Sequence, residues 1–141
     1  ETLPQDLACA QCGDHYARSM ASSGVFLSAC GFEYHGPQAR IGFAPRLSPE
    51  NFMCAFTSSE GWGSFSQIKS AGKWNAKISV RWGKLRVKSV ALEWAEASSI
   101  HVRQGQSEVP ATFSRTGKRI MISLNQPLEL AVGQSLDIFP A

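Results

Sequence analysis

From Phe32 onward, apolar and polar residues alternate in short runs that are separated by turn residues such as Gly36-Pro37 and Gly133-Gln134. An alternation with a period of two places the apolar side chains on one face of a strand, as in a half-buried sheet. Short strands at this spacing predict an antiparallel β-sandwich. The expected strands cover residues 41–44, 64–68, 76–82, 85–94, 99–103, 109–114, 119–124, 128–132 and 135–139.

The pattern differs between Asp14 and Cys30, where the sequence predicts a helix. Asp14 can cap its start, and Gly31 can supply the left-handed residue that follows its end. After Arg18 no charged residue occurs until Glu33, and small residues crowd the segment. Such a helix is covered nearly all round in a folded protein. A chain of 141 residues that is mainly β, with one N-terminal helix, struggles to provide that cover.

Composition and charge indicate a globular chain without a concentrated charged surface. The 141 residues fit one compact domain that can bury a core without a disulfide or metal, and 43% of them are hydrophobic. The formal net charge is +3. The basic residues of one local cluster alternate with apolar residues, which predicts the solvent-exposed face of a sheet and no nucleic-acid partner. No segment is long and apolar enough to span a membrane, and the first residues do not resemble a signal peptide. The basic residues are Lys77, Arg81, Lys84, Arg86 and Lys88, and the apolar ones are Ile78, Val80, Leu85 and Val87.

Four cysteines, at Cys9, Cys12, Cys30 and Cys54, do not form a recognisable cofactor motif. Haem attachment would need a histidine directly after the C-x-x-C of Cys9 and Cys12, and His15 comes too late. A zinc site would need a second pair of ligands at short spacing. A redox motif would follow a strand in a parallel βαβ unit, and no such unit is visible. The best interpretation is free, mostly buried thiols in a reducing compartment, which favours the cytoplasm; no metal and no cofactor is expected.

The acidic residues do not predict a catalytic pair. Hydrolysis of a glycosidic bond normally takes two facing carboxyl groups, and none of the 11 Asp and Glu residues forms an obvious inward-facing pair. Glu60 precedes Gly61-Trp62-Gly63, where a Trp platform and a carboxylate could hold a sugar ring. A Trp in the core with a glutamate at a loop edge is the favoured interpretation. No catalytic residue can therefore be named.

Asp14, His15 and Arg18 fall within about one helical turn, where residues three or four apart share a face. Polar residues at the mouth of an otherwise apolar helix suit a hydroxyl-rich ligand, since His and Arg can donate to sugar oxygens. A structural network in which Arg18 pairs with Asp14 explains the same spacing. The spacing leaves both interpretations open.

The run from Cys12 to about Gln67 resembles the end of the catalytic region of family 116 glycoside hydrolases, a family of bacterial β-glucosidases and non-lysosomal glucosylceramidase-like proteins. The resemblance covers somewhat under half of the chain. The matching stretches are Cys12 to Ser22 (CGDHYARSMAS), Gly31 to Pro37 (GFEYHGP), Gly42 to Arg46 (GFAPR), Ser48 to Phe52 (SPENF), Phe56-Thr57 and Glu60 to Gly63 (EGWG).

The resemblance implies that residues 14–30 form the last helix of an (α/α)6 barrel, so that residues 1–31 belong to the barrel and residues 32–141 form a β-rich C-terminal domain. The family's catalytic carboxylates would lie upstream, on a larger catalytic chain that is the expected partner. Arg18 matches the family's sugar-binding arginine, and His15 and Asp14 are secondary candidates for substrate binding. Gln11 stands where close relatives are expected to have an acidic residue.

The function implied is that of a C-terminal fragment or small subunit of a β-glycosidase, which binds part of a β-glycoside substrate and is inactive alone. The alternative is a free-standing, non-catalytic β-sandwich with a carbohydrate-binding or structural role. That alternative predicts exposed aromatic residues, with Trp62 or Trp74 as candidates, whereas Trp82 and Trp94 are expected to point inward or to pair within strands.

Overall fold

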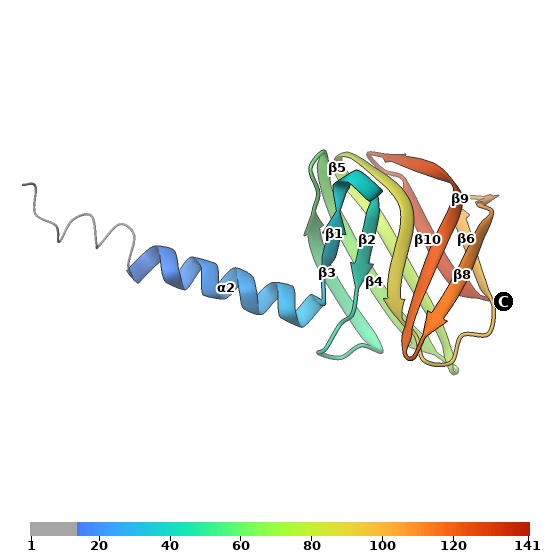
Figure 1. Ribbon diagram of the computed structural model, residues 1–141, viewed down its shortest axis with the longest axis horizontal. Coiled ribbons are helices and arrows are strands. Elements are labelled where there is room, and N and C mark those ends of the chain that lie inside the picture. The colour runs from blue at the N-terminus through green and yellow to red at the C-terminus, as the bar shows by residue number, and fades with distance from the viewer. Residues whose placement is uncertain (1–13) are drawn as a thin grey trace, which may run out of the picture.

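The computed structural model describes residues 14–141 and is mainly β (Figure 1). This confirms the predicted fold class of a β-rich chain with one N-terminal helix among the described residues. The elements in chain order are helix α2 (Asp14–Cys30), β1 (Glu33–His35), the short 3-10 helix η1 (Gly36–Gln38), β2 (Arg40–Phe43), β3 (Asn51–Thr57), β4 (Gly61–Ser70), β5 (Lys73–Glu93), β6 (Ile100–Gln104), β7 (Ser107–Glu108), β8 (Ala111–Thr116), β9 (Arg119–Ala131) and β10 (Ser135–Pro140).

The strands form two layers that share β5. The first half of β5 pairs with β4 and β10, and its second half pairs with β2 and β9. One layer therefore has the order β3-β4-β5-β10-β6-β7 and the other the order β1-β2-β5-β9-β8. The pairing differs from the expectation in one place, because β2 and β5 run parallel. The β3–β4 excursion lies between β2 and β5 along the chain and supplies the long connection that a parallel pair needs.

Strand β5 turns a corner at Gly83, where the sequence predicted two separate strands. The pairing with β4 slips at this point: Trp62 lies opposite Trp82, but Gly63 lies opposite Val80, so Arg81 is the extra residue of a β-bulge. Gly83 has φ +72°, and a Cβ on it would collide with the backbone of Glu60. The bulge and the glycine let one strand pass from one layer to the other (Figure 1).

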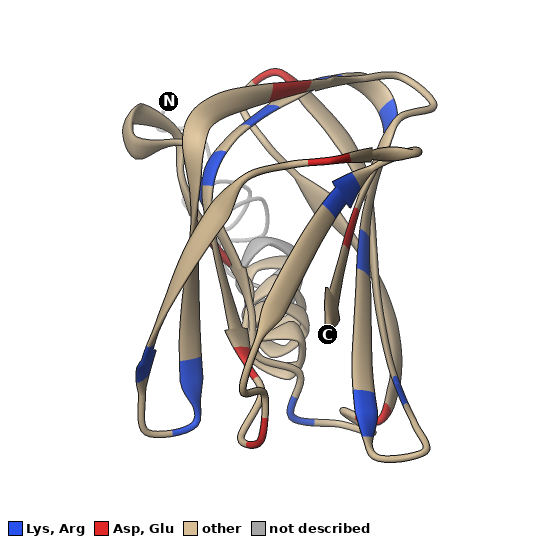
Figure 2. Cartoon of the chain, turned by 90° about the vertical axis from the view of Figure 1, so that its right-hand side faces the viewer, with Lys and Arg blue, Asp and Glu red and all other residues tan. Residues whose placement is uncertain are grey.

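The core lies between the two layers. Phe43 of β2 stacks on Phe65 of β4 with ring centroids 3.9 Å apart, and Trp74 stacks on Trp94 at 6.2 Å. The apolar residues of the alternating segment point into this core, as predicted, and the basic residues between them point outward. Figure 2 shows Lys, Arg, Asp and Glu spread over strands and turns, in agreement with the weak electrostatics expected from the sequence. The buried members of that segment are Ile78, Val80, Leu85 and Val87.

Helix α2 projects away from the sandwich, and the sheets cover only its last turn (Figure 1). The backbone N–H groups of Ala44 and Arg46 donate to the carbonyls of Cys30 and Ala29, both at 3.0 Å, and fix the end of the helix. Gly31 follows with φ +57°, which confirms its predicted left-handed conformation. Residues 19–28 are all exposed, so the cover that the helix composition calls for is not provided by the chain's own sheets. No helix among residues 14–141 is long and apolar enough to cross a membrane.

Candidate functional site

The sugar-binding residues expected from the resemblance lie at the start of α2 or before it. Gln11 falls outside the described residues. Asp14, His15 and Arg18 occupy the first five positions of α2, at the end that points away from the sheets (Figure 1). Asp14 and Arg18 are four residues apart and so share one face of the helix. Their roles in sugar binding, and the alternative pairing of Asp14 with Arg18, remain predictions.

The exposed surface of α2 is apolar and small. Its large hydrophobic residues are between 45% and 70% exposed, whereas most of the sandwich's hydrophobic residues are buried. Since no charged residue occurs from position 19 to the end of the helix, the surface lacks the polar face of a solvent-exposed amphipathic helix. Such a surface can bury apolar area against another protein element. The large exposed residues are Met20, Val25, Phe26 and Leu27.

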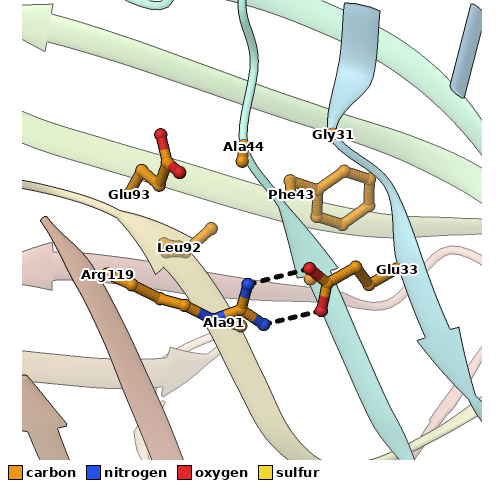
Figure 3. A pocket seen from close by; sticks show the side chains of 9 residues that line it. Gly31, Glu33, Phe43, Ala44, Ala91, Leu92, Glu93 and Arg119 are labelled. Atoms are coloured by element: carbon orange, nitrogen blue, oxygen red, sulfur yellow. Dashed lines mark hydrogen bonds and ion pairs between the residues drawn. The ribbon is translucent and has the colours of Figure 1, made fainter. Parts of the chain in front are cut away.

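A Glu33–Arg119 ion pair joins β1 to β9 across the outer face of its sheet (Figure 3). The guanidinium donates to both oxygens of Glu33, at 2.8 and 2.6 Å, and passes over Gly42 and Ala91. Arg119 holds the pKa of Glu33 below its ordinary value, and Glu33 raises the pKa of Arg119. Since both carboxylate oxygens of Glu33 accept hydrogen bonds from Arg119, we interpret this carboxylate as structural.

From Glu33 onward every Asp or Glu residue is at least partly exposed, and no two of these residues form an inward-facing pair. Glu60 lies 3.9 Å from Nζ of Lys84, which also approaches Glu129 at 3.2 Å. His101 Nδ1 lies 2.9 Å from Oε1 of Glu108 at the edge of an open groove. This pair could not be predicted from the sequence, because the two residues meet only through the β6–β7 hairpin. Within residues 14–141 no group of three His, Cys, Asp or Glu side chains could hold a metal ion.

Two of the four tryptophans are exposed on the outer face of the sandwich. Trp62 of β4 is 48% exposed and Trp82 of β5 is 64% exposed, whereas Trp74 and Trp94 are 9% and 0% exposed. The expectations for Trp62 and Trp94 are confirmed. Trp74, expected as an exposed residue, is buried, and the placement of Trp62 in the core is wrong. Trp82 is paired within strands, opposite Trp62, which is one of the two arrangements expected for it, but it does not point inward. The bulge before Gly83 explains its outward position, because it reverses the inward and outward phase of β5.

The two described cysteines, Cys30 at the end of α2 and Cys54 on β3, are free and buried. Burial and the neighbouring Cys30 raise the pKa of Cys54 to about 12. A thiol in this state is a core residue without nucleophilic reactivity. The interpretation as buried free thiols is therefore confirmed for this pair, and Cys9 and Cys12 lie outside the described residues.

Comparison with known proteins does not identify a family. No family model matches the chain, and no curated protein matches it. Among solved structures, an α-L-rhamnosidase from Dictyoglumus thermophilum is similar to 80% of this chain, with 12% sequence identity and a TM-score of 0.43. The chain spans only 12% of the length of that enzyme. A likeness this weak identifies neither a family nor a function.

Proposed function

We propose that this chain is the C-terminal fragment or small subunit of a β-glycosidase, in which α2 completes an (α/α)6 barrel formed by a larger catalytic chain. Residues 1–31 then belong to the barrel, and residues 32–141 form the β-rich domain that follows it. In this assembly the catalytic carboxylates come from the larger chain. Arg18 binds sugar hydroxyls, with His15, Asp14 and Gln11 as further substrate contacts.

The observation that carries this proposal is the uncovered apolar surface of α2. Helix α2 has 17 residues, and helices in proteins gain most of their stability from packing rather than from intrinsic propensity. Burying each large exposed residue of α2 would contribute on the order of 1–2 kcal/mol, somewhat below the full burial value because part of each side chain already lies against the helix. A barrel whose other helices surround α2 supplies that burial, and the resemblance of residues 12–22 to the last barrel helix of family 116 enzymes supplies the identity of the partner.

Native mass spectrometry of the protein isolated from its source, together with a β-glucosidase assay, tests the proposal. The expected result is that the chain is found within an assembly or polypeptide far larger than 15.3 kDa, and that activity accompanies the large species alone. A lone 15.3 kDa species without activity would contradict the proposal.

The substitution Arg18→Ala tests the assigned sugar contact in the assembled enzyme. We expect kcat/KM to fall by roughly 30- to 1000-fold, which corresponds to the roughly 2–4 kcal/mol lost with a charged hydrogen bond to the substrate. Arg103→Ala is the matched control, because Arg103 is an exposed arginine on β6, where it lies over the ring of Phe139. Equal kinetics for both variants, with normal assembly, would remove Arg18 from the substrate site.

A free-standing carbohydrate-binding module is the second candidate function. The exposure of Trp62, which this alternative predicted, favours it. It differs from the first candidate in requiring no larger chain, so that the same mass measurement separates the two: the module is isolated as a 15.3 kDa species that binds sugar without cleaving it.

A further inference from the structure

The β-bulge at Arg81 brings two tryptophans to the same face of the sandwich. Before the bulge every second residue of β5 is buried, from Trp74 to Val80, so that Trp82 would be the next buried residue. The extra residue reverses this phase and sets Trp82 directly opposite Trp62 on the outer face. A tryptophan that is about half exposed or more forgoes part of the hydrophobic stabilisation of burial. A fold that places two such residues opposite each other on paired strands therefore offers an apolar platform to a ligand.

A groove of about 380 Å³ lies along β5 next to this platform. Arg81, the bulge residue itself, lines it together with Lys77, Ser79 and Ser135 from the paired strands β5 and β10 (Figure 1). No acidic side chain lines the groove, and no ion pair links Arg81 or Lys77 to an acidic residue among those described. The groove therefore presents two cations, two hydroxyl groups and the exposed side chain of Val132, and the acidic residue nearest to it in the strand pairing is Asp137, opposite Lys77.

We propose that the face formed by β4, the first half of β5 and β10 binds an acidic oligosaccharide, such as a chain of uronic acids. The apolar C–H faces of sugar rings pack on Trp62 and Trp82, where they gain from the burial of apolar area. Sugar hydroxyls exchange hydrogen bonds with Ser79 and Ser135, which can both donate and accept. The carboxylate of an acidic sugar lies between Arg81 and Lys77, where charge-assisted hydrogen bonds are the strongest contacts available.

The mixture of side chains favours a glycan over a protein or a nucleic acid. On β4, Ser64 and Ser66 separate Trp62 from the next exposed apolar residue, Ile68, and Lys77 of β5 lies opposite Ser66, whereas the centre of a protein interface is depleted of charge. Two free cations are few for a nucleic-acid groove, and the neighbouring Lys84 is paired with Glu60 and Glu129. The site lies wholly within the β region, so it stands independently of the proposed barrel.

Isothermal titration calorimetry of the full chain with tetragalacturonate and with neutral cellotetraose tests this site. The acidic probe is expected to bind more tightly, and raising the salt concentration to about 0.5 M should weaken it selectively. Trp62→Ala and Trp82→Ala should each lower the affinity for both probes by about 10-fold, and Arg81→Gln should lower it for the acidic probe alone. Leu47→Ala is the matched control, because Leu47 is an exposed hydrophobic residue of the loop before β3.

Three results would overturn the proposal. One is the absence of binding to both probes by a wild-type chain whose circular dichroism is that of a folded β protein. Another is binding that survives both tryptophan substitutions. The third is tighter binding of a single-stranded oligonucleotide than of tetragalacturonate. Quenching of the exposed tryptophans by acrylamide gives a second readout: tetragalacturonate should protect them in the wild type and in Leu47→Ala, and much less in Arg81→Gln.

Discussion

Gln67 provides the sharpest test of how the two layers are held together. It is 1% exposed, and its amide makes two hydrogen bonds: Nε2 donates to the carbonyl of Pro49 at 2.8 Å, and Nε1 of Trp94 donates to Oε1 at 3.1 Å. The side chain thus connects β4, the end of β5 and the loop before β3. Gln67→Leu keeps a similar volume but removes both bonds. It leaves a donor and an acceptor without partners.

The loss of stability depends on how deeply the two groups that lose their hydrogen-bond partner, the Trp94 N–H and the Pro49 carbonyl, are buried. Trp94 is 0% exposed, so its N–H cannot reach water and its loss of a partner costs roughly 1–3 kcal/mol. The Pro49 carbonyl bond is only partly buried, so hydration recovers some of the loss and about 0.5–1.5 kcal/mol remains. We expect a total destabilisation of about 2–4 kcal/mol. Gln126→Leu, at an exposed position of β9, is the matched control and should change stability by less than about 0.5 kcal/mol.

Urea denaturation followed by circular dichroism and tryptophan fluorescence measures these values, provided that both probes give coincident transitions. A double-mutant cycle with Trp94→Phe, which removes the indole N–H, isolates the buried bond. Gln67→Leu should cost about 1–2 kcal/mol less in that background than in the wild type. A single-variant loss below about 1 kcal/mol, or full additivity in the cycle, would refute the reasoning.

The Glu33–Arg119 pair is expected to matter little, because both side chains are more than a third exposed: Glu33→Gln should destabilise the chain by less than about 1 kcal/mol at neutral pH. Because Arg119 lowers the pKa of Glu33, the stabilisation from the pair is fully present above the unfolded pKa of the carboxyl and is lost as the pH falls through its folded pKa. The free energies of unfolding of the wild type and the variant should therefore converge in urea titrations at acidic pH. A difference in stability that widens at acidic pH would contradict this sign. Cys54, whose pKa is raised to about 12, should react with a disulfide reagent at pH 8 only on unfolding, with Cys54→Ser as the control; rapid labelling of Cys54 in the native state would show that β3 opens easily.

The alternation of apolar and polar residues predicted the β region well, because the buried face of each strand is fixed by a local period of two. The prediction failed at Arg81, where the alternation of buried and exposed residues shifts by one position. Nothing in the local sequence around Arg81 distinguishes a bulge from a continuous strand, so the outward position of Trp82 could not be predicted. At the slip the backbones of the two strands lie close together, because a Cβ on Gly61 would collide with the carbonyl of Trp82 and one on Gly63 with that of Ser79. Such long-range packing is not visible in a single sequence.

The helix was predicted over residues 14–30, and the structure describes it from Asp14 to Cys30. Its end could be predicted because the terminal Gly31 is a local signal, and the capping role of Asp14 stays a prediction. The sequence indicated only that the rest of the chain could not cover the helix, and it did not show what would cover it. The same holds for the candidate sugar contacts: the spacing of Asp14 and Arg18 puts them on one face of a helix, but spacing alone does not identify the group that they would contact.

The two exposed surfaces of the molecule differ in composition, and this difference indicates different occupants. The α2 surface combines small and apolar residues without charge, which suits close packing against other helices. The face around Trp62 and Trp82 mixes aromatic rings, hydroxyls and cations, which suits a hydroxylated ligand that carries charge. If each surface has its own occupant, the two sets of variants must act separately. Trp62→Ala should leave the mass of the assembled enzyme unchanged, and Arg18→Ala should leave the affinity for tetragalacturonate unchanged. A cross-effect in either direction would mean that one partner covers both surfaces.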